Sequence, residues 1–172
     1  MSLLTVIALV LTLFTSCTTN QGTPAPAFAL SDMTGRQFSL VDYKWQKAVL
    51  LLFANCNNGG IQDPLVQGYI SRYQNASGLV TLCVANGAAI PADVRQYMAG
   101  QIGGCQAGSV DASGTLPMMD ADGSVGKAFG ASPDKLSLVL VDRSGYIRFR
   151  EEITSTAETD TELAKQIEDV TK

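Results

Sequence analysis

The sequence contains no histidine, and its 172 residues include only four cysteines and one tryptophan. Without imidazole, histidine-based metal sites and catalysis by a Cys-His or Ser-His pair are excluded. The twelve lysines and arginines form no basic run, so nucleic acid is not an expected partner. The sequence indicates no metal and no cofactor. We therefore expect any chemistry to start at a thiol, and Cys56 is the first candidate.

The N-terminal residues 1–16 carry no charge, are strongly apolar and lead directly into Cys17. A membrane-spanning helix needs roughly 20 apolar residues, whereas a secretory signal needs only roughly 7 to 15. The small residues before Cys17 resemble a bacterial lipobox, in which this cysteine is lipidated and becomes the mature N-terminus. We expect a lipoprotein-type signal peptide over 1–16 and a tether over 17–26, rich in Thr, Pro, Ala and Gly.

This interpretation predicts an exported protein of the cell envelope. It would be anchored in the membrane through its N-terminal lipid, on the periplasmic or extracellular side. Ordinary signal cleavage and a retained N-terminal anchor are the alternatives.

Residues 27–172 are expected to form one mildly acidic domain, because the net charge of the chain is −4 and all charged residues lie after residue 16. A chain of this length can bury a full core without metals or many disulfides. The segment Asp120–Gly123 is similar to part of a calcium loop, but it lacks the third acidic position and the distal glutamate. We interpret it as a turn.

The run Ala48–Ala54 is continuously apolar and ends just before Cys56. Such a run, without polar alternation, is typical of a central strand that is covered on both faces. Cys56 would then lie at the C-terminal edge of the sheet, where a following helix would favour the nucleophilic thiolate. The polar residues around it, Asn55 and Asn57–Gly60, indicate an exposed turn. The alternative is a small buried hydrophobic side chain, since free cysteine is often buried.

The remaining pattern alternates apolar strands with amphipathic helices, which predicts an α/β fold with a parallel strand-helix-strand crossover. The expected strands are 28–30, 37–40, 48–54, 79–85, 136–141 and 146–152, and the expected helices are 61–75, 91–102, 124–129 and 160–170.

This order of elements resembles the thioredoxin superfamily, specifically the redoxin branch with alkyl hydroperoxide reductase/thiol-specific antioxidant proteins and membrane-anchored thiol-disulfide oxidoreductases. The motifs that carry the resemblance are Pro26–Gly35, Phe53–Cys56, Leu116-Pro117 with Asp120–Gly123, Phe129-Gly130, and Leu138–Ile147. Pro64 stands eight residues after Cys56, where the membrane-anchored branch has a proline that kinks the active-site helix. The resemblance implies a thioredoxin-like fold with a central mixed sheet and helices on both faces.

The candidate active-site loop departs from the motifs of both branches. The family's Cys-x-x-Cys reads Cys56-Asn57-Asn58-Gly59 here, so the second thiol is absent, and Asn55 replaces the preceding tryptophan. The peroxiredoxin threonine is replaced by Phe53. Leu136 stands where the dithiol branch has its cis-proline. The predicted site is therefore a degenerate one, consisting of Cys56 with Asn55, Asn57, Asn58, Gly59 and Pro64.

Two further cysteines lie in the domain. Cys83 sits within an apolar strand and is expected in the core. Cys105 follows a predicted helix in a glycine-rich loop, near the place where some atypical two-cysteine peroxidases of this superfamily carry the resolving cysteine. A structural disulfide or an idle thiol is the alternative for Cys105.

Three functions are consistent with these features. The first is an envelope oxidoreductase in which Cys56 attacks a disulfide of a protein partner or a hydroperoxide, resolved by Cys105 or an external thiol. The second is a non-catalytic binding or assembly module that has lost the dithiol. The third, an enzyme like glutathione peroxidase, is weaker, because Asn57 follows the cysteine and the only tryptophan, Trp45, precedes the strand.

Overall fold

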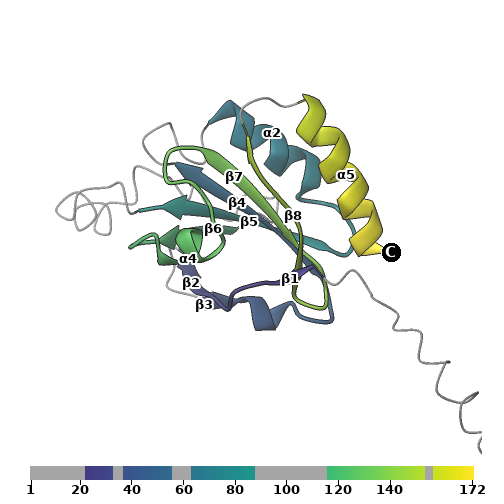
Figure 1. Cartoon of the computed structure of the whole chain (residues 1–172), viewed down its shortest axis with the longest axis horizontal. Coiled ribbons are helices and arrows are strands. Elements are labelled where there is room, and N and C mark those ends of the chain that lie inside the picture. Colours follow the sequence, from purple (N-terminus) through teal and green to yellow (C-terminus); the bar gives the residue numbers. More distant parts are fainter. Residues whose placement is uncertain (1–21, 33–36, 56–62, 88–115, 154–156) are drawn as a thin grey trace, which may run out of the picture.

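The computed structural model describes residues 22–32, 37–55, 63–87, 116–153 and 157–172 (Figure 1). In this part of the chain, eight strands form one mixed sheet in the order β1-β8-β7-β4-β5-β6-β2-β3. The strands are β1 (Thr23–Pro24), β2 (Ala29–Asp32), β3 (Gln37–Ser39), β4 (Ala48–Asn55), β5 (Leu79–Asn86), β6 (Leu116–Asp120), β7 (Leu136–Val141) and β8 (Tyr146–Ile153). The helices are the 3-10 helix η1 (Leu40–Asp42) and the α-helices α2 (Pro64–Tyr73), α4 (Ser124–Ala128) and α5 (Ala157–Thr171).

Strand β4 lies at the centre of the sheet, as its apolar sequence predicts. It runs parallel to β5 and antiparallel to β7, so the sheet is mixed. Every residue from Ala48 to Ala54 is at most 1% exposed. Such burial requires cover on both faces, which confirms the prediction of a central strand with helices on each side.

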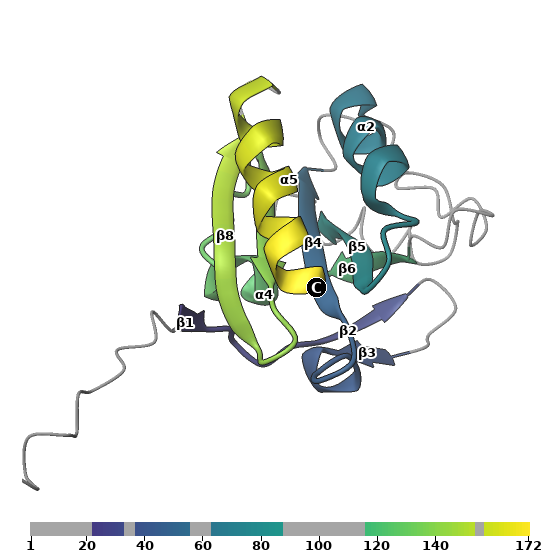
Figure 2. The same cartoon turned by 90° about the vertical axis from the view of Figure 1, so that its right-hand side faces the viewer.

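The two faces of β4 bury alternate side chains against different elements. Leu50 and Leu52 pack against residues of α2 and α5, and we call this side the α2–α5 face. Leu51 and Phe53 pack with Phe129, directly after α4, and with side chains from β2 and β3, and we call this side the α4 face. Figure 2 shows α2 and α5 lying on the same side of the sheet. The apolar sides of the two longer helices, α2 and α5, thus pack on the same face of the sheet.

Helix α2 begins later than the sequence periodicity predicts. Asp63 has non-helical backbone angles, and its side chain caps the helix by accepting a hydrogen bond from the Leu65 N–H at 2.8 Å. Pro64 is therefore the first helical residue, where a missing N–H costs no hydrogen bond. In the described residues Pro64 therefore opens α2 and does not lie inside it.

Two strands were not predicted. β1 lies within the segment interpreted as a tether, so the end of that segment, from Thr23, pairs with β8 and belongs to the sheet. β6 includes Pro117 and pairs in parallel with β5 and antiparallel with β2. The expected helix over 91–102 lies outside the described residues. In the part of the chain that is described, no helix is long and apolar enough to cross a membrane.

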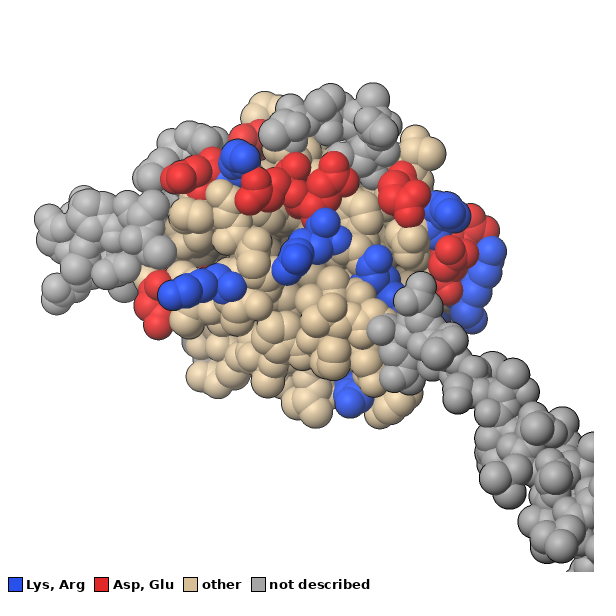
Figure 3. Space-filling model, viewed as in Figure 1, with Lys and Arg blue, Asp and Glu red and all other residues tan. Residues whose placement is uncertain are grey.

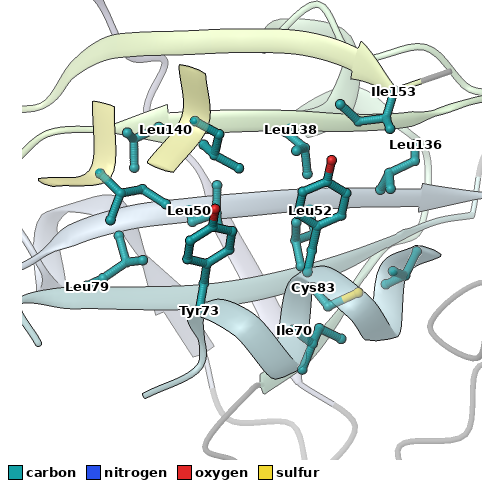
Figure 4. Close-up of a cluster of buried hydrophobic side chains, with 14 of the residues drawn as sticks. Leu50, Leu52, Ile70, Tyr73, Leu79, Cys83, Leu136, Leu138, Leu140 and Ile153 are labelled. Atoms are coloured by element: carbon teal, nitrogen blue, oxygen red, sulfur yellow. The ribbon is translucent and has the colours of Figure 1, made fainter. Parts of the chain in front are cut away.

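Cys83 lies in the core, as expected. Its side chain is fully buried on the α2–α5 face among side chains that include Leu52 and Ile70 (Figure 4). Loss of hydration raises the pKa of the Cys83 thiol to about 12. The buried thiol is therefore protonated and inert at neutral pH.

This burial predicts an alkaline loss of stability. An exposed thiol in the unfolded chain ionises near pH 8.5 and the buried one does not, so the contribution of Cys83 to stability is full below that pH and is lost as the pH rises toward 12. Between pH 9 and 10.5, the wild-type protein should lose roughly 1 kcal/mol per pH unit more than Cys83→Ala. Urea unfolding across this range measures the difference. Parallel curves for the two proteins would contradict the assignment.

Candidate functional site

The candidate site lies at the C-terminal edge of the parallel strands. β4 ends at Asn55, so Cys56 is the first residue beyond the strand. Asn55 pairs in register with Asn86 of β5, and Asn86 pairs with Asp120 of β6. Three neighbouring strands therefore end in polar residues at the same edge of the sheet. In open α/β sheets, ligands bind at this edge, outside the carboxyl ends of the strands.

Only part of the predicted site falls within the described residues. Asn55 is the last residue of β4, and Pro64 opens α2. The remaining predicted site residues, Cys17, Cys56, Asn57, Asn58, Gly59 and Cys105, lie outside the described residues. What the structure provides is the framework around the candidate nucleophile: the strand that precedes it, the helix that follows it and the neighbouring strand ends.

Asp120 connects several elements at this edge through hydrogen bonds. It is 2% exposed, and its Oδ2 accepts a hydrogen bond from the Gly126 N–H at 2.7 Å. Its backbone oxygen accepts from the Gly87 N–H at 2.9 Å and the Gly123 N–H at 3.3 Å. Asp120 therefore joins the end of β5 to the start of α4. The sequence pattern indicated only a turn at Asp120–Gly123, although an acidic residue directly after the apolar residues 116–119 was an available signal.

A hollow of about 480 Å³ opens on the α4 face of this edge. It is lined by Asn86, Asp122, Gly123, Lys127, Gly130, Ala131, Ser132, Pro133 and Glu152. These residues come from the end of β5, the β6–α4 turn, α4, the loop before β7 and the end of β8. The sequence did not predict this lining, because it is gathered from five separate segments.

The loop between α4 and β7 forms one wall of the hollow. The Ser132 N–H donates to the Ser137 Oγ at 3.2 Å, which fastens the loop to β7 beside the end of β4, where Ser137 pairs with Phe53. At the rim, the Lys135 Nζ lies 2.9 Å from the Glu152 carboxylate, and this carboxylate raises the pKa of Lys135. The wall is thus polar and carries both signs of charge.

Leu136 occupies the position of the family's cis-proline, and it is the first residue of β7. The peptide bond before it is trans, like all others in the described residues. Its side chain is buried on the α2–α5 face, away from the hollow. The hollow is instead lined by residues of the preceding loop, among them Ser132 and Pro133.

Taken together, the edge offers a central strand that ends at Asn55 and a hollow lined by both charged and apolar residues. Such a hollow can hold a polar or charged group while a thiol reacts. The sheet order, with the cysteine after the central strand, defines a thioredoxin-like fold.

Comparisons with known proteins agree at the level of the fold. No protein-family model matches the chain, and no curated protein matches it in sequence. Among solved structures, the chain is similar to a candidate thiol:disulfide interchange protein, DsbE, from Chlorobium tepidum, with 23% identity, TM-score 0.59 and coverage of 88% of this chain and 98% of that one.

Two further structures are similar. One is the exposed lipoprotein thioredoxin from Streptococcus pneumoniae, with 19% identity, TM-score 0.56 and coverage of 83% and 99% of the two chains. The other is the mitochondrial 2-Cys peroxiredoxin from Plasmodium falciparum, with 13% identity, TM-score 0.57 and coverage of 87% and 93%. The expected fold, an α/β thioredoxin-like domain with a mixed central sheet, is therefore confirmed.

The buried Asp120 carboxylate generates a prediction about the scaffold of the site. Asp120→Ala removes the acceptor of the buried Gly126 N–H, which should cost about 1–3 kcal/mol of unfolding free energy. Asp122→Ala is the control, because Asp122 is exposed and its contact with the Ser124 N–H lies at the surface, so its effect on stability should be much smaller. Chemical denaturation of both variants provides the comparison. Equal effects would show that Asp120 does not organise this edge.

Proposed function

We propose that the protein is a thiol-dependent oxidoreductase in which Cys56 is the nucleophile toward a disulfide or a hydroperoxide. The observation that carries the proposal is that β4, the central buried strand, ends at Asn55, immediately before Cys56 in the sequence, and that Asn86, the register partner of Asn55, lines a hollow. The structural likeness to thiol:disulfide interchange and peroxiredoxin folds supports a thiol-redox role.

With a disulfide substrate, the Cys56 thiolate attacks one sulfur, a mixed disulfide forms and the other substrate sulfur leaves as a thiolate. A second thiol, from Cys105 or from an external thiol, then attacks the mixed disulfide and releases the reduced substrate. The new disulfide joins Cys56 to this second thiol, and an external reducing thiol must cleave it before the next turnover. The two electrons gained by the substrate come from these two thiols.

With a hydroperoxide, the Cys56 thiolate attacks the outer peroxide oxygen, becomes a sulfenic acid and releases an alcohol, or water from hydrogen peroxide. The sulfenic acid condenses with the thiol of Cys105 or of an external molecule to form a disulfide and water. An external thiol reductant then restores the enzyme. This route requires only one thiolate and one partner thiol.

The composition of the loop favours the peroxide or mixed-disulfide route over rapid dithiol reduction. Gly59 replaces the second cysteine, so the mixed disulfide cannot be resolved from within a Cys-x-x-Cys motif. Leu136 replaces the proline that shapes the substrate groove in the dithiol branch. We expect little disulfide reductase activity.

A non-catalytic binding or assembly module is the second candidate. The same two replacements, Gly59 and Leu136, favour it, because a scaffold can persist after its dithiol is lost. A protein partner would then bind at the hollow at this edge of the sheet without a reaction.

The proposed location is the cell envelope, with Cys17 lipidated. The uncharged apolar residues 1–16 and the small residues before Cys17 support it. The similarity to an exposed lipoprotein thioredoxin is consistent with it. In such a compartment, Cys56 would meet protein disulfides or peroxides from outside the cytosol.

Cysteine variants test the chemistry. Cys56→Ser should abolish peroxide reduction and mixed-disulfide formation, because it removes the nucleophile, and Cys105→Ser should slow turnover. Cys83→Ala is the control and should retain activity, since that thiol is buried and protonated. For each of the three variants, thiol consumption with hydrogen peroxide measures the activity, and mass spectrometry identifies the oxidised cysteines. If Cys56 stays unoxidised and no Cys56–Cys105 disulfide forms, the binding module is the better account.

The N-terminus tests the location separately. The mature chain isolated from membranes should begin at Cys17 and carry the mass of a lipid modification, whereas Cys17→Ser should remain unprocessed or become soluble. Intact-mass and N-terminal peptide analysis decide between these states. An intact Met1, or an unmodified N-terminus downstream of Cys17, would rule out the lipoprotein.

A further inference from the structure

Two large apolar side chains are exposed in the described residues. Val41 is 72% exposed and Trp45 is 71% exposed, and both lie in the segment that leads from η1 into β4. Two lysines accompany them. Lys44 Nζ lies 5.5 Å from the centroid of the Trp45 ring, and Lys47 is exposed. We call Val41, Lys44, Trp45 and Lys47 the Trp45 patch.

The backbone of Trp45 makes its exposure more unusual. Its φ is 68°, and among the described residues no other residue apart from glycine has a positive φ. The Trp45 N–H donates to the Arg143 backbone oxygen at 2.7 Å, which holds this conformation. Glycine would adopt it without strain. Neither burial of the ring nor backbone preference explains an indole at this position, so its reason lies outside the folded domain.

The patch lies at the end of the domain where the ordered sheet begins. Trp45 is bonded to Arg143, and the Ala25 N–H, next to β1, donates to the Gly145 backbone oxygen at 2.9 Å. One turn, between β7 and β8, therefore contacts both the patch and the start of the sheet. Figure 2 shows β1 and η1 on the same lower side of the domain.

The distance from the proposed lipid is short. Gly22, the first described residue, stands five residues after Cys17. Five extended residues span at most about 18 Å. A lipid on Cys17 would thus hold this end of the domain close to the bilayer.

We propose that the Trp45 patch docks on the phospholipid surface in which the Cys17 lipid is anchored. This inference rests on the lipidation proposed above. Indole rings favour the membrane interface, and lysines are attracted to anionic headgroups. The acidic residue within the segment, Asp42, is engaged by the Ser39 N–H and hydroxyl.

The charge distribution fits this orientation. In Figure 3, acidic side chains gather along the upper side of the domain, while the lower side, where η1 and β1 lie in Figure 1, is largely uncharged with an isolated basic residue. A protein with net charge −4 would otherwise be repelled by anionic lipid. Docking through the Trp45 patch keeps the acidic side away from the headgroups.

Docking has a consequence for the candidate site. β4 begins three residues after Trp45 and runs for eight residues to Asn55, a distance of about 26 Å at 3.3 Å per residue. The C-terminal edge with Cys56 therefore lies at the far end of the domain from the patch. A docked domain would present Cys56 away from the bilayer, toward soluble protein disulfides or peroxides.

Trp45 is the only tryptophan, so its fluorescence reports on the patch directly. The lipidated full chain should be reconstituted into phosphatidylcholine vesicles with about one quarter phosphatidylglycerol. Replacing part of the phosphatidylcholine by a brominated form should quench the emission by roughly half, because the ring lies at the interface. Unquenched, acrylamide-accessible emission would overturn the proposal.

Variants separate docking by the patch from mere tethering. A Gly-Ser insertion of about 20 residues between Asn20 and Gln21 should leave most of the quenching, since the patch itself binds lipid. The combined variant Val41→Ser, Lys44→Glu and Lys47→Glu should lose it, whereas the neighbouring exposed control Gln46→Ala should not. Trp45→Gly should unfold at no lower a urea concentration than the wild type. A clear loss of stability would mean that the indole serves the fold.

Other outcomes are equally decisive. A blue shift that grows with protein concentration in the absence of vesicles would assign the patch to a second copy of the chain. A mature chain without lipid would overturn both this inference and the proposed location. A lipidated chain that reduces peroxide while Trp45 stays unquenched would overturn the docking alone and leave the proposed chemistry intact.

Discussion

The burial of β4 on both faces is the constraint on which the rest of the structure depends. Leu50 and Leu52 must meet α2 and α5, while Leu51 and Phe53 must meet the α4 face. A shift of β4 by one residue would exchange the side chains of its two faces. Both faces would still be apolar, so burial alone does not fix the position of β4. Its register is fixed by pairing with β5 and β7. The end of β4, and with it the start of the candidate loop, is thereby held at one edge of the sheet.

Much of this arrangement was predictable, because it follows from long apolar runs. The strands at β4, β5 and β7 and the helix α5 each carry a strong periodic or continuous signal. The missed strands carry none: β1 has two residues and includes Pro24, and β6 includes Pro117, a residue disfavoured in sheets. The start of α2 was missed because the spacing from Ile61 outweighed the capping signal of Asp63 before Pro64.

The candidate site was less predictable than the fold. A cysteine after an apolar strand can be recognised from sequence, but the hollow at this edge of the sheet combines residues from β5, α4 and the end of β8 that only the sheet order brings together. Asp120 is another example, since its partner Gly126 lies six residues away across a tight turn. The described residues thus form a thioredoxin-like sheet with its covering helices, and the proposed redox chemistry depends on Cys56, which directly follows β4 in the sequence.

The proposed chemistry depends on the state of the Cys56 thiol in the folded protein. Its pKa can be measured from the pH dependence of the alkylation rate, followed for each cysteine by mass spectrometry. The account predicts that Cys56 reacts in the native protein with an apparent pKa at or below about 8.5, the value of an unperturbed thiol. A Cys56 that reacts only after unfolding would contradict the proposed role of this residue as a nucleophile.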